Sequence, residues 1–309
     1  MNGVLVIDKP KGWTSHDVVA RVRKILQAKK AGHGGTLDPL ATGVLPVYLG
    51  EGTKLVPFNL KGTKEYVATM RLGQETDTLD ADGQVIAERR DFFFTREEIE
   101  AVLEKFRGLI QQMAPLFSAI KWNGLPLYKR ARAGEKPKLA TREIMIHALS
   151  LEELSLPFIT IAVICGRGTY LRSLCADIGR VLGCGAHLVD LRRLRSGRFS
   201  LEQALNLEIL SGLVEGGKIG ERIIPLKDGV DVSGRIWVGE DTAETIRHGR
   251  SLRLQNLTRS DRSWLRIGQR VGLLYGPAKL LAIAESQVDG SEPFADNSEA
   301  LRILRVFHE

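Results

Sequence analysis

The sequence predicts an α+β fold with a mixed or antiparallel sheet, followed by a small β-rich domain. Apolar residues recur with strand and helix periods in an irregular alternation, unlike the regular succession of a doubly wound fold. The chain has 309 residues, enough for one large domain or two of ordinary size. After Pro225 the apolar runs become short and are separated by glycines. We therefore expect one domain over residues 1–229 and a second over residues 230–309.

The first part of the chain predicts a strand, a helix and a second strand. Residues 3–8 are an apolar run typical of a short buried strand, and "DKPKG" then turns the chain, because proline lacks a donor and glycine permits positive φ. Ser15 is the expected N-cap of a helix that ends before Gly32. The apolar stripe of this helix is Val18, Val19, Val22, Ile25 and Leu26. The run "VLPVYL" predicts the next strand.

The middle of the chain predicts a half-buried strand, an acidic loop and a helix. Residues 64–72 alternate between apolar and polar side chains, which indicates a strand with one buried face. The stretch "GQETDTLDADG" after it is acidic and typical of a solvated loop, and it lacks the glutamate at the twelfth position of a calcium loop. Thr95 and Glu98 form a capping box. The helix that they begin carries Ile99, Val102, Leu103 and Phe106.

The second half predicts two more strands, over residues 142–149 and 158–165, before a helix in "CGRGTYLRSLCADIGRVLGCG". The apolar face of that helix is Leu171, Leu174, Cys175, Ile178 and Leu182. A further strand or turn, "HLVDLRRLRSGRF", and a helix from Ser200 complete the first domain. The polar stretch "KDGVDVSGR" predicts a linker to the second domain.

Charge and composition indicate a nucleic-acid partner. The formal net charge is +7, and basic residues gather in two segments, 121–142 and 167–198. Either segment alone is compatible with a solvated face, but aromatic residues and glycines are interspersed in both, which favours a nucleic-acid surface. The three cysteines show neither a C-x-x-C pair nor zinc-ligand spacing, so we expect structural thiols and no metal. With no signal peptide or membrane span in the sequence, we expect a cytoplasmic protein.

The stretch "GHGGTLDPLATG", residues 32–43, holds four glycines around a single acid, Asp38. It fits neither a phosphate-binding loop nor a dinucleotide fingerprint, and an oxyanion hole of the "HGG" kind would need a serine elbow that the chain lacks. A purely structural turn remains one interpretation. In the other, Asp38 reacts: the glycines admit a substrate, Pro39 holds the aspartate extended, and its carboxylate is a nucleophile. Glycoside hydrolysis commonly uses two carboxylates, so a lone acid in a basic chain favours chemistry on a nucleic acid.

The longer motif "GHGGTLDPLATGVLP" resembles the catalytic motif of the TruB family of tRNA pseudouridine synthases. The likeness spans about residues 3–205 and continues in order through "DKPKGWTS", "KEYVATMRLGQETDTLDADG", "PLFSAIKWNGLPLYKRARAGE", "GRGTYLRSL" and "GCGAHLVDLRRLRSG". Several long motifs in one order make the resemblance specific. Beyond them, "GEDTAETIRHGRSLRL" resembles a PUA-type RNA-binding module.

The resemblance implies an isomerase that breaks the N1–C1′ bond of the T-loop uridine of tRNA, position 55, turns the uracil and rejoins it through C5. It implies that Asp38 is the catalytic aspartate, that Arg172 pairs with it and that Tyr66 stacks on the uracil. These roles are physically consistent, because an adjacent arginine stabilises a carboxylate and an aromatic ring gives an extruded base a face to stack on. No cofactor is implied, since the reaction is redox-neutral.

The resemblance also places residues around the target uridine. Tyr170 and Leu191 match positions that line the pocket, although either is compatible with an ordinary core residue. His33 matches the histidine that enters the T-loop as the base leaves. Lys9 and Asp80 match motif positions without a defined role. From the basic segment, the side chains expected on the RNA backbone are Lys129, Arg130 and Arg132.

Two other functions stay open at this stage. One is an RNA-binding or tRNA-folding protein whose isomerase activity is secondary or absent, and the other is a nucleoside hydrolase that breaks the same bond without rejoining it. The chemistry of Asp38 is open too, because the carboxylate can attack C1′ or C6 or act through a glycal intermediate. We expect a monomer whose partner is the T-stem-loop of tRNA.

Overall fold

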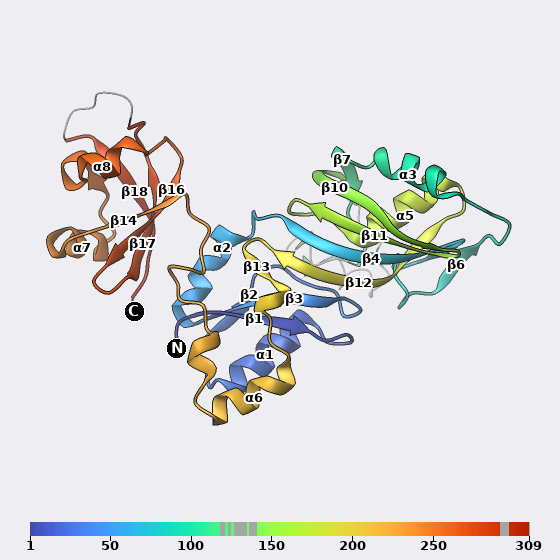
Figure 1. The fold of residues 1–309 in the computed structure, drawn as a ribbon, viewed down its shortest axis with the longest axis horizontal. Coiled ribbons are helices and arrows are strands. Elements are labelled where there is room, and N and C mark those ends of the chain that lie inside the picture. Colours follow the sequence, from blue (N-terminus) through green and yellow to red (C-terminus); the bar gives the residue numbers. More distant parts are fainter. Residues whose placement is uncertain (118–120, 123–124, 127–134, 136–140, 291–296, 309) are drawn as a thin grey trace.

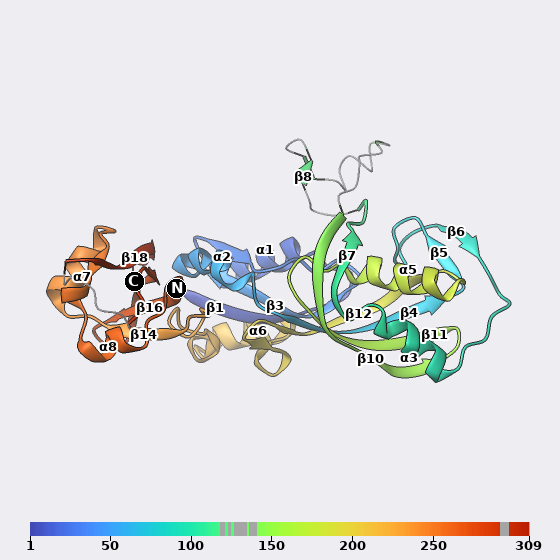
Figure 2. The same cartoon turned by 90° about the horizontal axis from the view of Figure 1, so that it is seen from above.

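The structure is a computed structural model that describes residues 1–117, 121–122, 125–126, 135, 141–290 and 297–308. Two sheets dominate it, one of nine strands and one of five (Figure 1). The five-stranded unit lies at one end of an elongated molecule and the hairpin β5 (Gln74–Thr76) and β6 (Val85–Glu88) at the other (Figure 2). Within the described ranges no helix is both long and apolar enough to span a membrane.

The nine-stranded sheet confirms the predicted mixed arrangement. Its neighbouring strands run antiparallel, apart from one short parallel pairing of residues 192–193 with 42–43. In spatial order the strands are β1 (Gly3–Lys9), β3 (Thr42–Leu49), β12 (Ala186–Ser196), β4 (Lys64–Leu72), β11 (Phe158–Cys165), β10 (Thr141–Ser155) and β7 (Gly108–Met113). Two short strands lie outside this order: β13 (Phe199–Ser200) pairs with β12, and β2 (Ala31–His33) pairs with β3.

Helices cover the sheet in two places. Helix α5 (Leu171–Leu182) packs on β4 and β12 with α3 (Arg96–Glu104) beside it, and their apolar faces close the largest core. Helices α1 (Ser15–Ile25) and α6 (Leu207–Glu215) lie together beneath β1 and β3 (Figure 1). The remaining short elements of this part are η1 (Gly50–Leu55), α2 (Val56–Asn59), β8 (Lys121–Trp122), β9 (Leu125–Pro126), η2 (Leu201–Gln203) and η3 (Ile219–Arg222).

The structure confirms several elements that were predicted from local sequence patterns. Strand β4 has the predicted bounds and alternating burial, and the Thr95–Glu98 capping box begins α3 as expected. Strand β10 continues to Ser155, beyond the predicted end at residue 149, because it pairs with β11 along that length.

Two predicted helix starts are wrong. Thr14, not Ser15, caps α1, because its hydroxyl accepts from the N–H of Asp17 in a capping box. Ser200 caps only the short 3-10 helix η2, and the α-helix expected from that point, α6, begins at Leu207 after Asn206 caps it.

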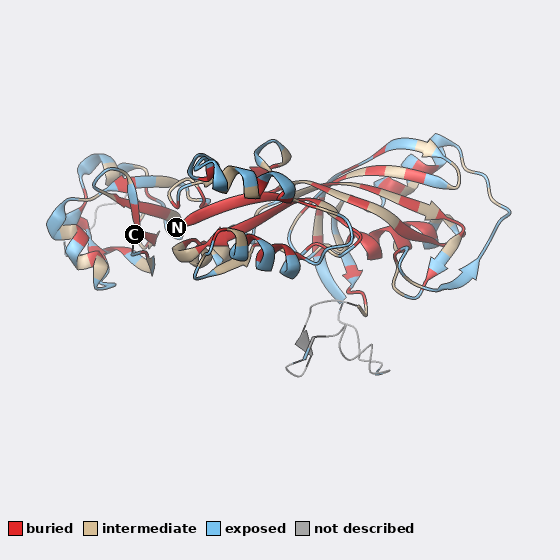
Figure 3. Cartoon of the chain, turned by 90° about the horizontal axis from the view of Figure 1, so that it is seen from below, coloured by how far each residue is buried: buried red, intermediate tan, exposed pale blue. Residues whose placement is uncertain are grey.

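The five-stranded sheet forms the rest of the structure. The first unit packs directly against it: Val4 and Val6 of β1 share a core with Leu274, Ile283 and Phe307. The connecting segment is also anchored there, since Val230 is 1% exposed. Figure 3 shows buried residues continuing from one sheet toward the other. In spatial order the strands are β14 (Gly234–Trp237), β16 (Arg270–Tyr275), β17 (Lys279–Ser286), β18 (Glu299–Val306) and β15 (Leu252–Arg253), with helices α7 (Glu240–Arg247) and α8 (Arg259–Ser263) and the turn η4 (Leu254–Asn256).

Candidate active site

The turn that carries Asp38 joins β2 to β3 and is held through its backbone. Ser15 Oγ donates to the carbonyl of Leu37 at 3.0 Å and accepts from its N–H at 2.8 Å. On the other side, the N–H of Gly12 donates to the carbonyl of Pro39 at 2.8 Å. The Asp38 side chain nevertheless keeps 35% of its surface exposed. The carboxylate is thus accessible on a fixed stretch of chain.

Two glycines of the turn are required by packing within the chain. A Cβ at Gly34 would lie 2.7 Å from the ring of Tyr48. Gly43 has a φ of 101°, and a Cβ there would clash with the backbone carbonyl of Arg193. These two glycines therefore shape the turn, which differs from the expectation that the glycines make room for a substrate.

Arg172, in the first turn of α5, joins the Asp38 turn to the acidic loop. Its Nε lies 2.9 Å from Asp38 Oδ2, and Nη1 lies 3.4 Å from Asp80 Oδ2. The Nε–H does not point at the Asp38 oxygen as in an aligned hydrogen bond, so this contact is an ion pair set by distance. Two carbonyls fix the rest of the guanidinium: Nη1 donates to Thr78 O at 3.2 Å and Nη2 to Phe117 O at 2.8 Å. The predicted pairing of Arg172 with Asp38 is present.

The acidic loop over residues 73–83 is solvated only in part: Glu75, Asp77 and Asp82 are exposed, as predicted for the loop, whereas Asp80 is buried. Thr76 and Asp80 are 2% and 5% exposed, because the loop packs against β12. Asp80 accepts from the Thr78 hydroxyl at 2.5 Å and from the N–H of Asp82 at 3.2 Å. Burial raises the pKa of Asp80, and these hydrogen bonds oppose the rise. Asp80 therefore supports the arginine from the side opposite Asp38.

Tyr66 and Leu191 lie on one face of the nine-stranded sheet. Tyr66 lies on β4, and its cross-strand neighbour on β12 is Arg193; Leu191 pairs with Ala68, two residues further along. Because strand side chains alternate, these side chains point to the same face of the sheet. Tyr66 is 7% exposed, and burial raises the pKa of its hydroxyl, an effect that Arg193 opposes.

Tyr170 is the N-cap residue of α5 and is clamped by a side chain from β7. Gln112 Oε1 accepts from the N–H of Tyr170 at 2.8 Å, and Gln112 Nε2 donates to its carbonyl at 3.1 Å. Gln112 is 2% exposed. This clamp fixes the start of α5, and hence the backbone that presents Arg172. Gln112 was not predicted as a site residue, although it shares an inward position with Ile110 in the strand period.

Lys9 and His33 lie on either side of the Asp38 turn. Lys9 is fully buried at the end of β1, and its ammonium donates to the carbonyls of Pro10, Trp13 and Pro39 at 2.9, 2.6 and 3.3 Å. Burial lowers its pKa to about 8. His33 is half-buried at the end of β2, and burial lowers its pKa as well, which favours a neutral ring. Lys9 thus bonds directly to the Asp38 turn through the Pro39 carbonyl, whereas His33 lies at the end of the strand that leads into the turn.

Arg193 is a second buried residue near Asp38 that was not predicted as a site residue. It is 1% exposed, and its guanidinium donates to carbonyls in and next to the glycine-rich turn. In the segment "DLRRLRS" the strand alternation places Arg193 on the same inward face as Leu191. That alternation is the sequence signal that could have predicted the burial of Arg193.

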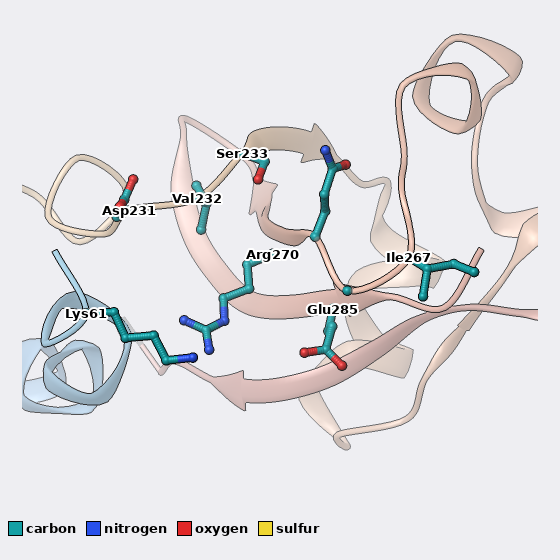
Figure 4. Close-up of a pocket in the computed structure, with 9 residues that line it drawn as sticks. Lys61, Asp231, Val232, Ser233, Ile267, Arg270 and Glu285 are labelled. Carbon is teal, nitrogen blue, oxygen red and sulfur yellow. The ribbon is translucent and has the colours of Figure 1, made fainter. Parts of the chain in front are cut away.

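A cavity of about 570 Å³ lies between the two units rather than at Asp38 (Figure 4). Lys61 of the first unit and Arg270 of β16 line it together with Asp231 and Glu285, and it contains none of the predicted site residues. In the part of the chain that the structure describes, no group of three or more His, Cys, Asp or Glu side chains is placed to hold a metal ion.

Family models match most of the first unit. The model described as "TruB family pseudouridylate synthase (N terminal domain)" matches residues 23–171, and "tRNA pseudouridylate synthase B C-terminal domain" matches residues 172–227. The chain is 42% identical over 308 residues to tRNA pseudouridine synthase B of Geobacter sulfurreducens, with 100% of both chains covered. This chain belongs to the TruB family. Another TruB-family relative, tRNA pseudouridine synthase B of Pseudomonas aeruginosa, is 42% identical over 279 residues, with 89% of this chain and 91% of the relative covered.

Solved structures show the same fold for this member of the TruB family. A chain of a Cbf5–Nop10–Gar1 complex matches with a TM-score of 0.76 at 29% identity, covering 99% of this chain and 85% of that chain. A chain from an H/ACA RNP bound to a substrate RNA containing 2′-deoxyuridine matches with a TM-score of 0.75 at 28% identity and the same coverage. The predicted RNA-backbone residues Lys129, Arg130 and Arg132 lie outside the described residues.

Proposed function

We propose that this chain is a tRNA pseudouridine synthase that isomerises the T-loop uridine, with Asp38 as the nucleophile. The observation that carries the proposal is the ion pair between the half-exposed carboxylate of Asp38 and the buried guanidinium of Arg172. An oriented, charged carboxylate that solvent can reach is what a nucleophile needs. The names of the relatives support tRNA as the substrate class.

The side chains beside Asp38 stabilise both the extruded uridine and the charge that moves during the reaction. Extruding the uridine costs a few kcal/mol, and stacking on Tyr66 offsets part of that cost. As Asp38 forms its bond, the carboxylate loses charge and the uracil gains it, so Arg172 beside both stabilises the charge that moves. The same arrangement suits attack at C1′, attack at C6 and a glycal route, and we propose none of the three above the others.

Other residues are assigned to recognition. We place Tyr170 and Leu191 against the uridine and His33 in the vacancy that the base leaves, where a neutral ring stacks without bringing a charge into the loop. Lys9 and Asp80 act through the groups they hold, the Pro39 carbonyl and Arg172. On the RNA backbone we place Lys129, Arg130 and Arg132.

The division of labour along the chain belongs to the same proposal. Residues 1–229 are the catalytic domain, and residues 230–309 are a PUA-like domain that adds affinity for RNA. We further propose that the protein acts as a monomer on the T-stem-loop in the cytoplasm. The support is that the two family models end at residue 227, just before the five-stranded sheet.

The test is a modification assay on unmodified tRNA, with pseudouridine mapped by carbodiimide-dependent primer stops. We expect the parent protein to convert the T-loop uridine and Asp38→Asn to bind the RNA with similar affinity while making no pseudouridine. Asp177→Asn is the matched control, because Asp177 is an acid on the surface of α5 that pairs only with Arg180 among the described residues. Release of free uracil would identify a nucleoside hydrolase, and binding without conversion by the parent would identify an RNA-binding protein. Normal conversion by Asp38→Asn would remove Asp38 from the chemistry.

A further inference from the structure

Arg193 is a buried cation at the junction of three strands. In the register of the sheet its backbone pairs with Gly43 on β3 and with Tyr66 on β4. Only 1% of its surface is exposed. No carboxylate within the described ranges lies at ion-pair distance from it, in contrast to Arg192 and Arg195 on the same strand, which pair with Asp8 and Glu65.

The guanidinium of Arg193 joins both ends of the turn that carries Asp38. Nε donates to the carbonyl of Val44 at 2.7 Å, after the turn. Nη2 donates to Gly35 O at 3.1 Å, and Nη1 lies 3.5 Å from Thr36 O, both before Asp38. A single planar guanidinium therefore holds the chain before Asp38 at a set distance from the chain after it.

The same guanidinium reaches Tyr66. Tyr66 on β4 is the cross-strand partner of Arg193, and the charge of Arg193 opposes the rise that burial causes in the pKa of the Tyr66 hydroxyl. One residue thus contacts both the turn that presents the carboxylate and the ring assigned to the uracil face.

Burying the charge of Arg193 costs free energy of folding. A buried charge bonded only to neutral groups stabilises a fold less than well-packed apolar side chains of similar volume do. Its charge also lowers the pKa values of Lys9 and His33, so the surroundings bear the effect of a positive charge that is not neutralised locally. This destabilising placement points to a role other than stability.

We propose that Arg193 is a positioning residue for pseudouridine formation, which fixes the Asp38 turn relative to the ring of Tyr66. The inference rests on the proposed roles of Asp38 and Tyr66. A uracil stacked on Tyr66 then meets the carboxylate at one separation, and loss of the guanidinium lets the turn and the ring shift independently. Misplacement by about 1 Å costs on the order of a hundredfold in rate.

The test compares Arg193→Lys with Arg195→Gln in the tRNA modification assay. Lysine keeps the charge but lacks the planar fork, so it cannot bond the carbonyls of Val44 and Gly35 at the same time as the guanidinium does. We expect Arg193→Lys to lower kcat by about a hundredfold and to change KM less than threefold, because RNA contacts outside the pocket are kept. Arg195→Gln removes a charge from the same strand, but Arg195 is 44% exposed and bonds to Glu65, so kcat should stay near the parent value.

Tyr66→Phe isolates one contact of Arg193 and carries the test if Arg193→Lys does not fold. Phenylalanine keeps the stacking face, so a fall in kcat of about tenfold at constant KM supports the inference. Where both variants fold, the double variant should lose less than the product of the two single losses, since both changes break one unit. An Arg193→Lys protein with a kcat within threefold of the parent overturns the inference, as does an equal loss in Arg195→Gln or unchanged turnover by Tyr66→Phe. Failure of the parent protein to form pseudouridine would instead overturn the proposed function.

Discussion

Replacing Lys9 by methionine should change how the stability of the protein depends on pH. Lys9 is fully buried, and among the residues that the structure describes its ammonium is bonded only to the carbonyls of Pro10, Trp13 and Pro39. Burial lowers its pKa to about 8, whereas an unfolded lysine titrates near 10.4. Methionine has a similar length and no charge, so the variant keeps most of the packing and loses the titration.

The sign and size of the effect follow from proton linkage. Between pH about 8 and about 10.4 the unfolded chain binds the lysine proton and the folded protein has lost it, so the free energy of unfolding rises with pH. Each pH unit is worth about 1.4 kcal/mol, so the window amounts to about 3 kcal/mol. The carbonyl partners favour the charged form, which makes this an upper value.

The assay is urea unfolding of parent and Lys9→Met in buffers from about pH 7 to about pH 10, followed by circular dichroism. Subtracting the two free energies cancels the titration of every other group that the substitution leaves unchanged. We expect the difference, parent minus variant, to be constant below pH about 8 and to rise above it. A difference that stays flat up to pH about 10 would refute the reasoning, because Lys9 would then titrate as it does in the unfolded chain.

Three further predictions test other buried contacts. Because burial raises the pKa of Asp80, its stability contribution is full below pH about 3.9 and is lost as pH rises through the higher folded pKa; the advantage of Asp80→Asn over the parent in urea unfolding should therefore grow with pH, and a shrinking advantage would contradict this. Gln112→Glu puts a carboxylate oxygen against the Tyr170 carbonyl, so it should destabilise by about 2 kcal/mol at neutral pH and recover near pH 4.3, where a protonated carboxyl can donate; a pH-independent loss would argue against the clamp. Phe307→Ala should cost about 3–5 kcal/mol in thermal or urea unfolding, since Phe307 is 2% exposed in the core shared by the two units; Trp237→Ala, at 58% exposure, is the control, and equal effects would contradict the shared core.

The burial of Asp80 could not be predicted from the sequence. Four acids in one loop are typical of solvated chain, and the prediction followed that composition. Three of the four acids are exposed, but Asp80 is buried, because Leu188 of β12 bridges to it and Arg172 lies at ion-pair distance from its carboxylate. Both partners lie about a hundred residues away in the chain, so nothing within the loop itself could have indicated its burial.

The sequence by itself determined the features that depend on near neighbours. The alternation of β4 and the Thr95–Glu98 capping box are decided within a few residues, and the ordered motifs around Asp38 were enough to indicate the family and its fold class. Only the tertiary structure decided which groups Arg193 contacts. Strand β12 lies between β3 and β4, an order that no local pattern encodes, and this brings residue 193 beside both 43 and 66. Strand order reflects the burial of whole faces at once, so the partners of a buried charge become visible only when the sheet is assembled.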